Sequence, residues 1–431
     1  MSRLLIRNGR ILDPSQDLDA ELDCLVEDGR VVRIEPKLVE DGAEILDAEG
    51  AWVAPGLIDL HCHLREPGQE YKEDLASGGM AAVAGGFTQL ACMANTDPVN
   101  DDPSVTKYIL DRAAKDSPTK IRPIAAATRG LEGQVMTEMM ALREAGAIAF
   151  SDDGATIMDS SVMRRVFEYS TLAAAPVIVH AEDCHLRGGG VVNEGPVSTR
   201  LGLPGNPVAA EELMVARDIR LAKLTGAHLH IAHVSSAGSV ELIRRAREEG
   251  VRVTAEVTPH HLTLTDEATM TFDTNTRVAP PLRSASDLRV LRNALAEGVI
   301  DVMATDHAPH AVYEKEVEFT AAPPGMLGLE TALAVTLDLF RDGTLTPIEF
   351  VRRWSTNPAQ LFRLEGGSLR PGSPADIVLI NPDHEWTYDA GQGFSKSRNS
   401  PWTGQRMKGR AAATIVDGRL VYHHDRGVLI R

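Results

Sequence analysis

The sequence predicts an α/β protein, namely a (β/α)8 TIM-type barrel with a smaller β-sandwich domain built from both chain ends. Strand-like and helix-like segments alternate through the middle of the chain, and strand pairs with turn signals stand at both ends. Such alternation implies parallel strands joined by right-handed crossovers. No Gly-x-Gly-x-x-Gly follows the first middle strand, which argues against the dinucleotide-binding form of the alternative, an open sheet. We expect the sandwich in residues 1–54 and 366–431, and the barrel in residues 55–365.

The two chain ends carry the same kind of signal. Short β-type runs surround Asn-Gly or Asp-Gly dipeptides, which favour the positive φ angles of tight hairpin turns. We therefore expect strands from both ends to form one small β domain, with the rest of the chain inserted between them. The expected strand runs are 3–12, 24–35, 375–381 and 412–422, with turn signals at Asn8-Gly9, Asp28-Gly29 and Asp417-Gly418.

Eight strand candidates follow one another through the middle of the chain. Helical segments lie between most of them, and residues 210–224 and 238–249 place apolar residues three to four apart, as amphipathic helices do. Eight strand–helix units in this length fit a barrel with insertions. The predicted strands are 57–60, 87–93, 121–127, 147–151, 176–180, 228–233, 251–257 and 300–305.

Composition excludes several classes of protein. The 431 residues carry 61 acidic against 44 basic side chains, a net charge of -17, with no dense basic run, so we expect no nucleic-acid partner. No stretch of about 18 apolar residues is present to span a membrane, and the start of the chain lacks the apolar core of a signal peptide. The four cysteines form no Cys-x-x-Cys pair and are typical of a reducing compartment, so we expect a cytoplasmic protein.

Polar side chains that bind metals follow five of the predicted strands. In a barrel the carboxyl ends of all strands meet on one face, so these side chains are expected to share one pocket. Imidazole and carboxylate suit Zn²⁺, either as two ions bridged by a carboxylate or as one ion with a free carboxylate acting as base. A second His-x-His pair, His228 and His230, is interpreted as chance. The expected ligands are His61, His63, His180, His233, Asp306 and one of Asp152 and Asp153.

Three further residues near these strand ends suit an anionic substrate. Arg65 lies two residues beyond His63, where its guanidinium would grip a carboxylate with two hydrogen bonds. Asn95 follows the second strand, and His310 follows Asp306 by four residues. The competing interpretations are a surface salt bridge for Arg65, a turn cap for Asn95 and a solvent-facing loop residue for His310.

Two segments around these residues resemble the signatures of one family. Asp59-Leu-His-Cys-His-Leu-Arg-Glu-Pro-Gly68 and Ala304-Thr-Asp-His-Ala-Pro-His310 are similar to motifs of dihydroorotases in the amidohydrolase superfamily. The resemblance implies reversible hydrolysis of L-dihydroorotate to N-carbamoyl-L-aspartate in pyrimidine synthesis by zinc-activated hydroxide. It implies Asp306 as metal ligand and general acid/base, and Arg65, Asn95 and His310 as carboxylate-binding residues. It also implies a homodimer and, in some members, association with aspartate carbamoyltransferase.

The sequence departs from the family pattern at three places. Residues 144–158 contain no lysine to serve as the carboxylated bridge of many superfamily members, which counts against hydantoinases. Bacterial long-chain dihydroorotases resemble this sequence in having Asp-Asp-Gly at that point, and this resemblance implies Asp153 rather than Asp152 as the ligand. Ala279 stands where the family often has a substrate-binding Asn, and Pro324-Gly325 stands where Phe-Gly is common, so an apolar contact to substrate is altered while a backbone contact can remain. The alternatives are an allantoinase or hydantoinase, and a weakly active scaffold subunit for aspartate carbamoyltransferase.

Overall fold

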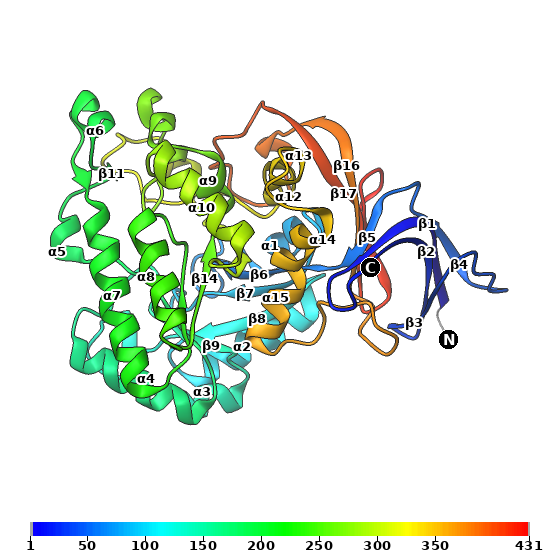
Figure 1. The fold of residues 1–431 in the computed structure, drawn as a ribbon, viewed down its shortest axis with the longest axis horizontal. Coiled ribbons are helices and arrows are strands. Elements are labelled where there is room, and N and C mark those ends of the chain that lie inside the picture. The colour runs from blue at the N-terminus through cyan, green and yellow to red at the C-terminus, as the bar shows by residue number, and fades with distance from the viewer. Residues whose placement is uncertain (1–2, 430–431) are drawn as a thin grey trace.

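The computed structural model describes residues 3–429 and has two parts (Figure 1). One is a barrel of parallel strands with helices around it, and the other is a β-sheet that holds both ends of the described chain. The predicted fold class is thereby confirmed. Each part has its own apolar core, and the larger core belongs to the barrel and its helices.

The barrel contains eight parallel strands, and all eight strand predictions are confirmed. They neighbour one another in the order β15-β14-β13-β10-β9-β8-β7-β6, so each strand pairs with the next one along the chain. The carboxyl ends of the strands therefore lie on one face of the barrel. The strands are β6 Leu57–Cys62, β7 Phe87–Cys92, β8 Lys120–Ala125, β9 Ala149–Ser151, β10 Val177–Val179, β13 Leu229–Ile231, β14 Val253–Val257 and β15 Val302–Met303.

The first and last strands close the barrel through a few contacts just beyond their ends. Cys62 and His307 form an isolated parallel bridge, and the backbone N–H of His63 donates to the carbonyl of His307 at 2.9 Å. Asp59 adds a side-chain connection, because its carboxylate accepts from Thr305 N at 2.8 Å and from Thr305 Oγ1 at 2.6 Å. The residues that follow β6 and β15 are thus fixed against each other.

Helices follow most strands of the barrel, and both predicted helices are present as α7 and α8. Side-chain caps begin several helices: Ser236 accepts from Ser239 N at the start of α8, and Asp159 caps α4 in the same way. The longer helices are α1 Leu75–Ala84, α2 Pro103–Asp116, α3 Met139–Ala145, α4 Ser160–Ala173, α7 Val208–Thr225, α8 Ala237–Glu248 and α10 Ala285–Glu297.

Shorter helices and turns complete the barrel. Ala359 and Phe362 of α15 pack against apolar side chains from six barrel strands. The short elements are α5 Cys184–Arg187, α6 Pro196–Leu201, α9 Pro259–Thr263, α11 Val312–Lys315, α12 Ala332–Thr336, α13 Asp338–Arg341, α14 Pro347–Val351, α15 Asn357–Phe362, η1 Arg129–Leu131, η2 Asp266–Thr271, η3 Thr274–Thr276, η4 Arg352–Thr356, η5 Ala390–Gln392, and the strand pair β11 Val192–Asn193 and β12 Gly205–Asn206.

Both chain ends join in one nine-stranded sheet. Its main order is β19-β18-β17-β16-β5-β1-β2-β3, with β4 paired to β1, so β5 connects the N-terminal strands to the C-terminal ones. Side chains from both ends share one core, in which Ile11 and Val53 pack with Ile377 and Ile415. The strands are β1 Arg3–Asp13, β2 Leu18–Glu27, β3 Arg30–Glu35, β4 Glu44–Asp47, β5 Trp52–Pro55, β16 Ile377–Thr387, β17 Arg406–Val416, β18 Arg419–His423 and β19 Gly427–Val428.

Two of the three turn predictions are confirmed and one is wrong. Asp28-Gly29 connects β2 to β3, and Asp417-Gly418 connects β17 to β18. Asn8-Gly9 instead lies within β1, where one extra residue forms a β-bulge opposite β2. Asn8 has a φ of 59°, and a Cβ added to Gly9 would lie 2.4 Å from Val53 Cγ2. The dipeptide therefore allows a bulge and a close approach of β5 rather than a chain reversal.

Two expectations about the environment of the chain can be compared with the structure. Within residues 3–429, none of the helices combines the length and apolarity that crossing a membrane requires. The cysteines are all free thiols, three of them buried, as their spacing predicts.

Candidate active site

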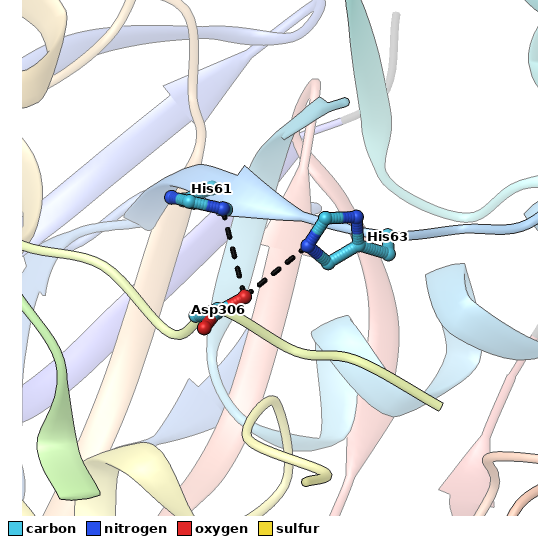
Figure 2. A group of neighbouring side chains, drawn as sticks. All are labelled: His61, His63 and Asp306. Atoms are coloured by element: carbon cyan, nitrogen blue, oxygen red, sulfur yellow. Dashed lines mark hydrogen bonds and ion pairs between the residues drawn. The ribbon is translucent and has the colours of Figure 1, made fainter. Parts of the chain in front are cut away.

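Six side chains predicted as metal ligands gather beyond the carboxyl ends of five barrel strands. All six are buried, although they come from segments up to 245 residues apart (61 to 306). Figure 2 shows three of them: His61 and His63 leave β6, and Asp306 faces both imidazoles. The remaining three are Asp153, His180 and His233, which follow β9, β10 and β13.

Asp306 and Asp153 both face the first pair of histidines. Oδ1 of Asp306 lies 3.2 Å from Nε2 of His63 and 3.5 Å from Nε2 of His61. Oδ2 of Asp153 lies 3.5 Å and 3.4 Å from the same two nitrogens. Two imidazole nitrogens and two carboxylate oxygens thus surround one small space.

The other oxygen of Asp153 faces the second pair of histidines. Its Oδ1 lies 3.5 Å from Nε2 of His233 and 3.8 Å from Nδ1 of His180. These two imidazole nitrogens lie 2.9 Å apart. Asp153 therefore stands between the two histidine pairs and turns one oxygen toward each.

The donor atoms fit a metal ion. Within residues 3–429, Nε2 of His61 and Oδ1 of Asp153 are buried without any hydrogen-bond partner, a costly state for polar atoms unless another group satisfies them. The donor atoms of His61, His63 and Asp306 lie within 4.8 Å of one another, as do those of His61, Asp153 and His233. Imidazole and carboxylate are ligands that suit divalent zinc.

The neighbouring Asp152 points away from this cluster. Its Oδ1 accepts from the backbone N–H groups of Ala127 and Thr128, both at 2.9 Å, and its Oδ2 accepts from the hydroxyl of Thr128. These contacts hold the loop after β8. Of the two aspartates that the sequence leaves open, only Asp153 faces the histidines.

The cluster holds its carboxylates in the ionised form. Burial by itself raises the pKa of Asp306, but His61 and His63 outweigh burial and hold that pKa below its usual range. His61 and His233 do the same for the pKa of Asp153. Ionised carboxylates are the form that a metal ion requires.

A buried carboxylate that sequence reasoning missed orients His61. Oε1 of Glu256 lies 2.5 Å from Nδ1 of His61, and its Oε2 lies 3.1 Å from Nε2 of His230. The interpretation of His228 and His230 as a chance pair is wrong for His230, which belongs to this network. The signal in the sequence is alternation, because Thr254 and Glu256 on β14 contact His230 on β13, and Thr254 also contacts His228 just before that strand.

Asn95 also contacts a predicted ligand. Its Oδ1 lies 2.9 Å from Nδ1 of His63, so the side chain orients that imidazole. Two further buried histidines, His260 and His261, lie in α9 just after β14. His261 contacts Thr258 Oγ1 at 2.8 Å and the Pro280 carbonyl at 3.1 Å.

A cavity of about 250 Å³ opens onto the cluster. Arg65 lies in its wall with a left-handed φ of 65°, and its Nε donates to the carbonyl of Pro309 at 3.2 Å. Burial lowers the pKa of Arg65 to about 10, which leaves the guanidinium charged at neutral pH. The cavity also contacts every other residue predicted to bind substrate, together with Ala279: Asn95, His310, Pro324 and Gly325.

His310 is held with one nitrogen free. Its Nε2 lies 2.9 Å from the carbonyl of Pro324, an acceptor, so this nitrogen carries the proton. Burial and the nearby Arg65 and Lys315 lower the pKa of His310 to about 2, so the ring is neutral. Within residues 3–429, its buried Nδ1 has no hydrogen-bond partner.

Two further residues that line the cavity, Glu182 and Arg187, were not predicted as site residues. Glu182 Oε2 lies 3.6 Å from Nε2 of His180 and 3.5 Å from Nε of Arg187, and both charged residues line the cavity. Arg187 is the last residue of α5 and is followed by three glycines, Gly188 to Gly190. The position of Glu182 two residues after His180, at a strand exit, is the signal that identifies it.

Comparison with known proteins yields family matches over most of the chain. Residues 50–239 match a family model described as dihydro-orotase-like, and residues 209–422 match one described as an amidohydrolase family. A dihydroorotase of Syntrophus aciditrophicus is 51% identical over 425 residues, covering 98% of this chain and 100% of that protein. A dihydroorotase of Pelobacter propionicus is 50% identical over 420 residues, covering 97% and 99%.

Similar solved structures carry other names. An L-hydantoinase (dihydropyrimidinase) from Arthrobacter aurescens has a TM-score of 0.90 at 26% identity, covering 100% of this chain and 98% of that one. A dihydropyrimidinase from Brevibacillus agri has a TM-score of 0.86 at 25% identity, covering 99% and 96%. The chain thus shares its fold, over nearly its whole length, with a solved hydantoinase and a solved dihydropyrimidinase.

Proposed function

This chain belongs to the dihydroorotase family of the amidohydrolase superfamily, and we propose that its cavity interconverts L-dihydroorotate and N-carbamoyl-L-aspartate. It is a metal-dependent cyclic amidohydrolase. One observation carries the assignment of the site: a single cavity joins the buried cation of Arg65 to the cluster of histidines and aspartates. The substrate needs both, since it has a carboxylate to be held and a ring amide to be opened.

We assign zinc to the cluster, with two ions per chain. His61, His63 and Asp306 would hold one ion and His180 and His233 the other, with Asp153 shared because its two oxygens face the two histidine pairs. A bound zinc ion supplies a Lewis acid that polarises the amide carbonyl and acidifies water.

Asp306 moves the proton in this proposal. Its carboxylate is ionised and lines the cavity, so it can accept a proton from the attacking water and pass it to the departing ring nitrogen. In the direction of ring closure the same carboxylate removes the proton from that nitrogen. His63 at 3.2 Å keeps Oδ1 in position.

The opposite wall of the cavity holds the substrate carboxylate. Arg65 provides a charged guanidinium, and Asn95 and His310 line the wall beside it. Because Nε2 already donates to Pro324, a neutral His310 has only a lone pair at Nδ1, so it would donate to the substrate carboxylate only as an imidazolium, a form that the negative charge of that carboxylate favours. Pro324 and Gly325 complete the wall, with Gly325 offering backbone rather than side chain.

A hydantoinase or allantoinase is the rival activity, since the similar solved structures are hydantoinases. Residues 144–158 contain no lysine for a carboxylated bridge, and Asp153 takes up the space between the histidine pairs instead. Arg65 is a cation that a ring without a carboxylate does not need. Both features favour dihydroorotate.

The remaining parts of the proposal concern the setting of the enzyme. We propose a cytoplasmic homodimer that can associate with aspartate carbamoyltransferase, supported by the free thiols and by the family. We also keep the division into a barrel of residues 55–365 and a second domain of residues 1–54 and 366–431. Size-exclusion chromatography with light scattering, alone and with the transferase, tests the assembly.

The direct test compares substrates and metal states. Purified enzyme is stripped with a chelator, reloaded with zinc, and assayed by ultraviolet absorbance on dihydroorotate, hydantoin and allantoin. We expect turnover of dihydroorotate only, lost on stripping and restored on reloading, with two zinc ions per chain by elemental analysis. Turnover of hydantoin or allantoin in place of dihydroorotate contradicts the substrate, and a zinc-loaded enzyme inactive on all three contradicts independent activity.

A further inference from the structure

A segment from the C-terminal part of the chain supports the wall of the cavity. Residues 393–405 connect η5 to β17, and they contact the loops that follow β6 and β15. At one end of this segment, Ser397 Oγ donates to the Lys72 carbonyl at 2.8 Å, and Lys396 N donates to Glu73 at 3.2 Å. At the other end Trp402 is buried against Val278. The segment is anchored on both sides of its middle.

Asn399 stands between these anchors and joins two loops of the cavity wall. Its Oδ1 accepts from the backbone N–H of His310 at 3.0 Å. Its Nδ2 donates to the carbonyl of Ala308 at 2.9 Å and to that of Gly325 at 3.1 Å. The side chain is only 3% exposed, so water does not replace these bonds. His310 belongs to the loop after β15, and Gly325 to the loop before α12.

The contacts accept only an amide in one orientation. The oxygen of the Asn399 amide faces an N–H group, and its nitrogen donates to two carbonyl oxygens. An aspartate or a leucine of similar size cannot make both kinds of contact. An aspartate would place a carboxylate oxygen beside two carbonyl oxygens. A leucine would leave the His310 N–H and the Ala308 carbonyl without a partner, and the Gly325 carbonyl with Lys315 alone, at a cost in free energy.

The two loops pass so close together that their relative position decides where His310 lies. A Cβ added to Gly325 would lie 2.7 Å from the Cβ of Ala308 and 3.1 Å from Nε2 of His310. The ring is also held by the carbonyl of Pro324, in the same loop as Gly325. A shift of either loop therefore moves the imidazole relative to Arg65, which lies on the same wall and donates to the carbonyl of Pro309.

We propose that Asn399 is a positioning residue for substrate binding, because it fixes the loop of His310 against the loop of Gly325. The Asn399 side chain does not touch the metal cluster. Its removal is therefore expected to weaken binding of the substrate carboxylate more than it slows opening of the substrate ring. The inference rests on the proposed roles of His310 and Gly325. It also means that the second domain contributes to the substrate pocket.

The test compares three substitutions of Asn399 with a matched control. Asn399→Asp and Asn399→Ala remove the donors, and Asn399→Ser is the mildest change because its hydroxyl can both donate and accept. Asn357→Asp is the control, since Asn357 Nδ2 also donates to a backbone carbonyl, that of Asp301 at 2.8 Å, but far from the cavity. KM and kcat for dihydroorotate, zinc content and melting temperature are measured for each zinc-loaded variant.

We expect Asn399→Ala and Asn399→Asp to raise KM about tenfold, with kcat within about twofold and zinc content unchanged. Asn399→Ser should raise KM less, and Asn357→Asp should leave KM unchanged even where it lowers the melting temperature. An unchanged KM in any folded Asn399 variant, Asn399→Ser included, overturns the proposal. So does a KM increase of the same size in Asn357→Asp.

A double-mutant cycle with His310→Ala separates this inference from the proposed site. If Asn399 acts through His310, adding Asn399→Ala to His310→Ala should raise KM by less than about threefold, because coupled residues are not additive. A full tenfold increase in that background contradicts positioning through His310. Should His310→Ala itself leave KM unchanged, the proposed role of His310 fails, whatever Asn399 does.

Discussion

Nδ1 of His61 lies 2.5 Å from Oε1 of Glu256, and neither side chain has exposed surface. Burial raises the pKa of Glu256, but His61 and His230 outweigh it and bring the pKa to about 2. An ionised carboxylate on Nδ1 keeps the proton there and turns the lone pair of Nε2 toward the metal position. Such a partner also raises the basicity of the imidazole as a ligand.

Glu256→Gln is therefore expected to weaken zinc binding by about tenfold to a hundredfold while the protein stays folded. The measurement is the zinc dissociation constant by competition with a chromogenic chelator. Asp376→Asn is the control, because Asp376 is also a buried carboxylate, but it pairs with Lys120 at 2.8 Å away from the cluster. Equal zinc affinity in Glu256→Gln and in the unmodified enzyme would contradict the role assigned to Glu256.

Arg65→Lys tests the cation of the cavity. Lysine keeps the charge but loses the planar fork and the Nε bond to Pro309, so we expect KM for dihydroorotate to rise about tenfold, and further in Arg65→Met. Steady-state kinetics checks this, with Arg164→Lys in an exposed pair with Glu168 as the matched control. If Arg65→Met binds dihydroorotate as well as the unmodified enzyme, the carboxylate is held elsewhere.

Gly325→Ala probes the tight approach of two cavity loops. Its φ of 134° is strained for alanine, and the new Cβ would lie 2.7 Å from Ala308, so we expect His310 to be displaced and KM to rise about tenfold or more. Gly343→Ala is the control: φ is 81° there, but no atom lies within 4 Å of the added Cβ. Both variants should lose stability, measured by thermal melting, and only the first should lose affinity for dihydroorotate.

The buried carboxyl of Asp218 is expected to lower the free energy of unfolding as pH rises. Burial raises the pKa of Asp218 to about 6 although Arg217 opposes this, while the unfolded carboxyl titrates near 4. Between these values the unfolded state ionises and the folded state does not, so stability falls as pH rises through this window and stays lower above it. The loss approaches about 3 kcal/mol, and Asp218→Asn should abolish it.

The measurement is the difference in free energy of unfolding between Asp218→Asn and the unmodified protein at several pH values. We expect the variant to gain relative stability from pH 4 to pH 6 and to keep it above pH 6. A difference that does not change with pH would show that Asp218 has the same pKa in both states.

The sequence was sufficient for the barrel because each barrel strand leaves a local pattern. Short apolar runs followed by a helix identify all eight strands, and the topology then brings His61, His180, His233 and Asp306 to one face without further information. The bulge at Asn8-Gly9 was missed because the same dipeptide serves a turn or a bulge, and only the approach of Val53 decides between them.

Residues that act through other residues left weaker signals. Glu256 looks like any charged residue on a strand until His61, 195 positions earlier, is placed against it. Asn399 lies in an irregular segment of the second domain, and nothing local to it points to His310. Contacts of this kind depend on how distant segments pack, which periodicity along the chain does not record.

The closure of the barrel has a consequence for when the active site is completed during folding. His61 and His63 leave the first strand, and Asp306 leaves the last, so the ion position among them straddles the line where the two edges of the barrel meet. A nascent chain that ends before residue 300 has the two histidines and Asp153 but not Asp306, the second carboxylate that faces them. Closure of the barrel therefore completes this set of donor atoms, and an ion held among them would link the first strand to the last.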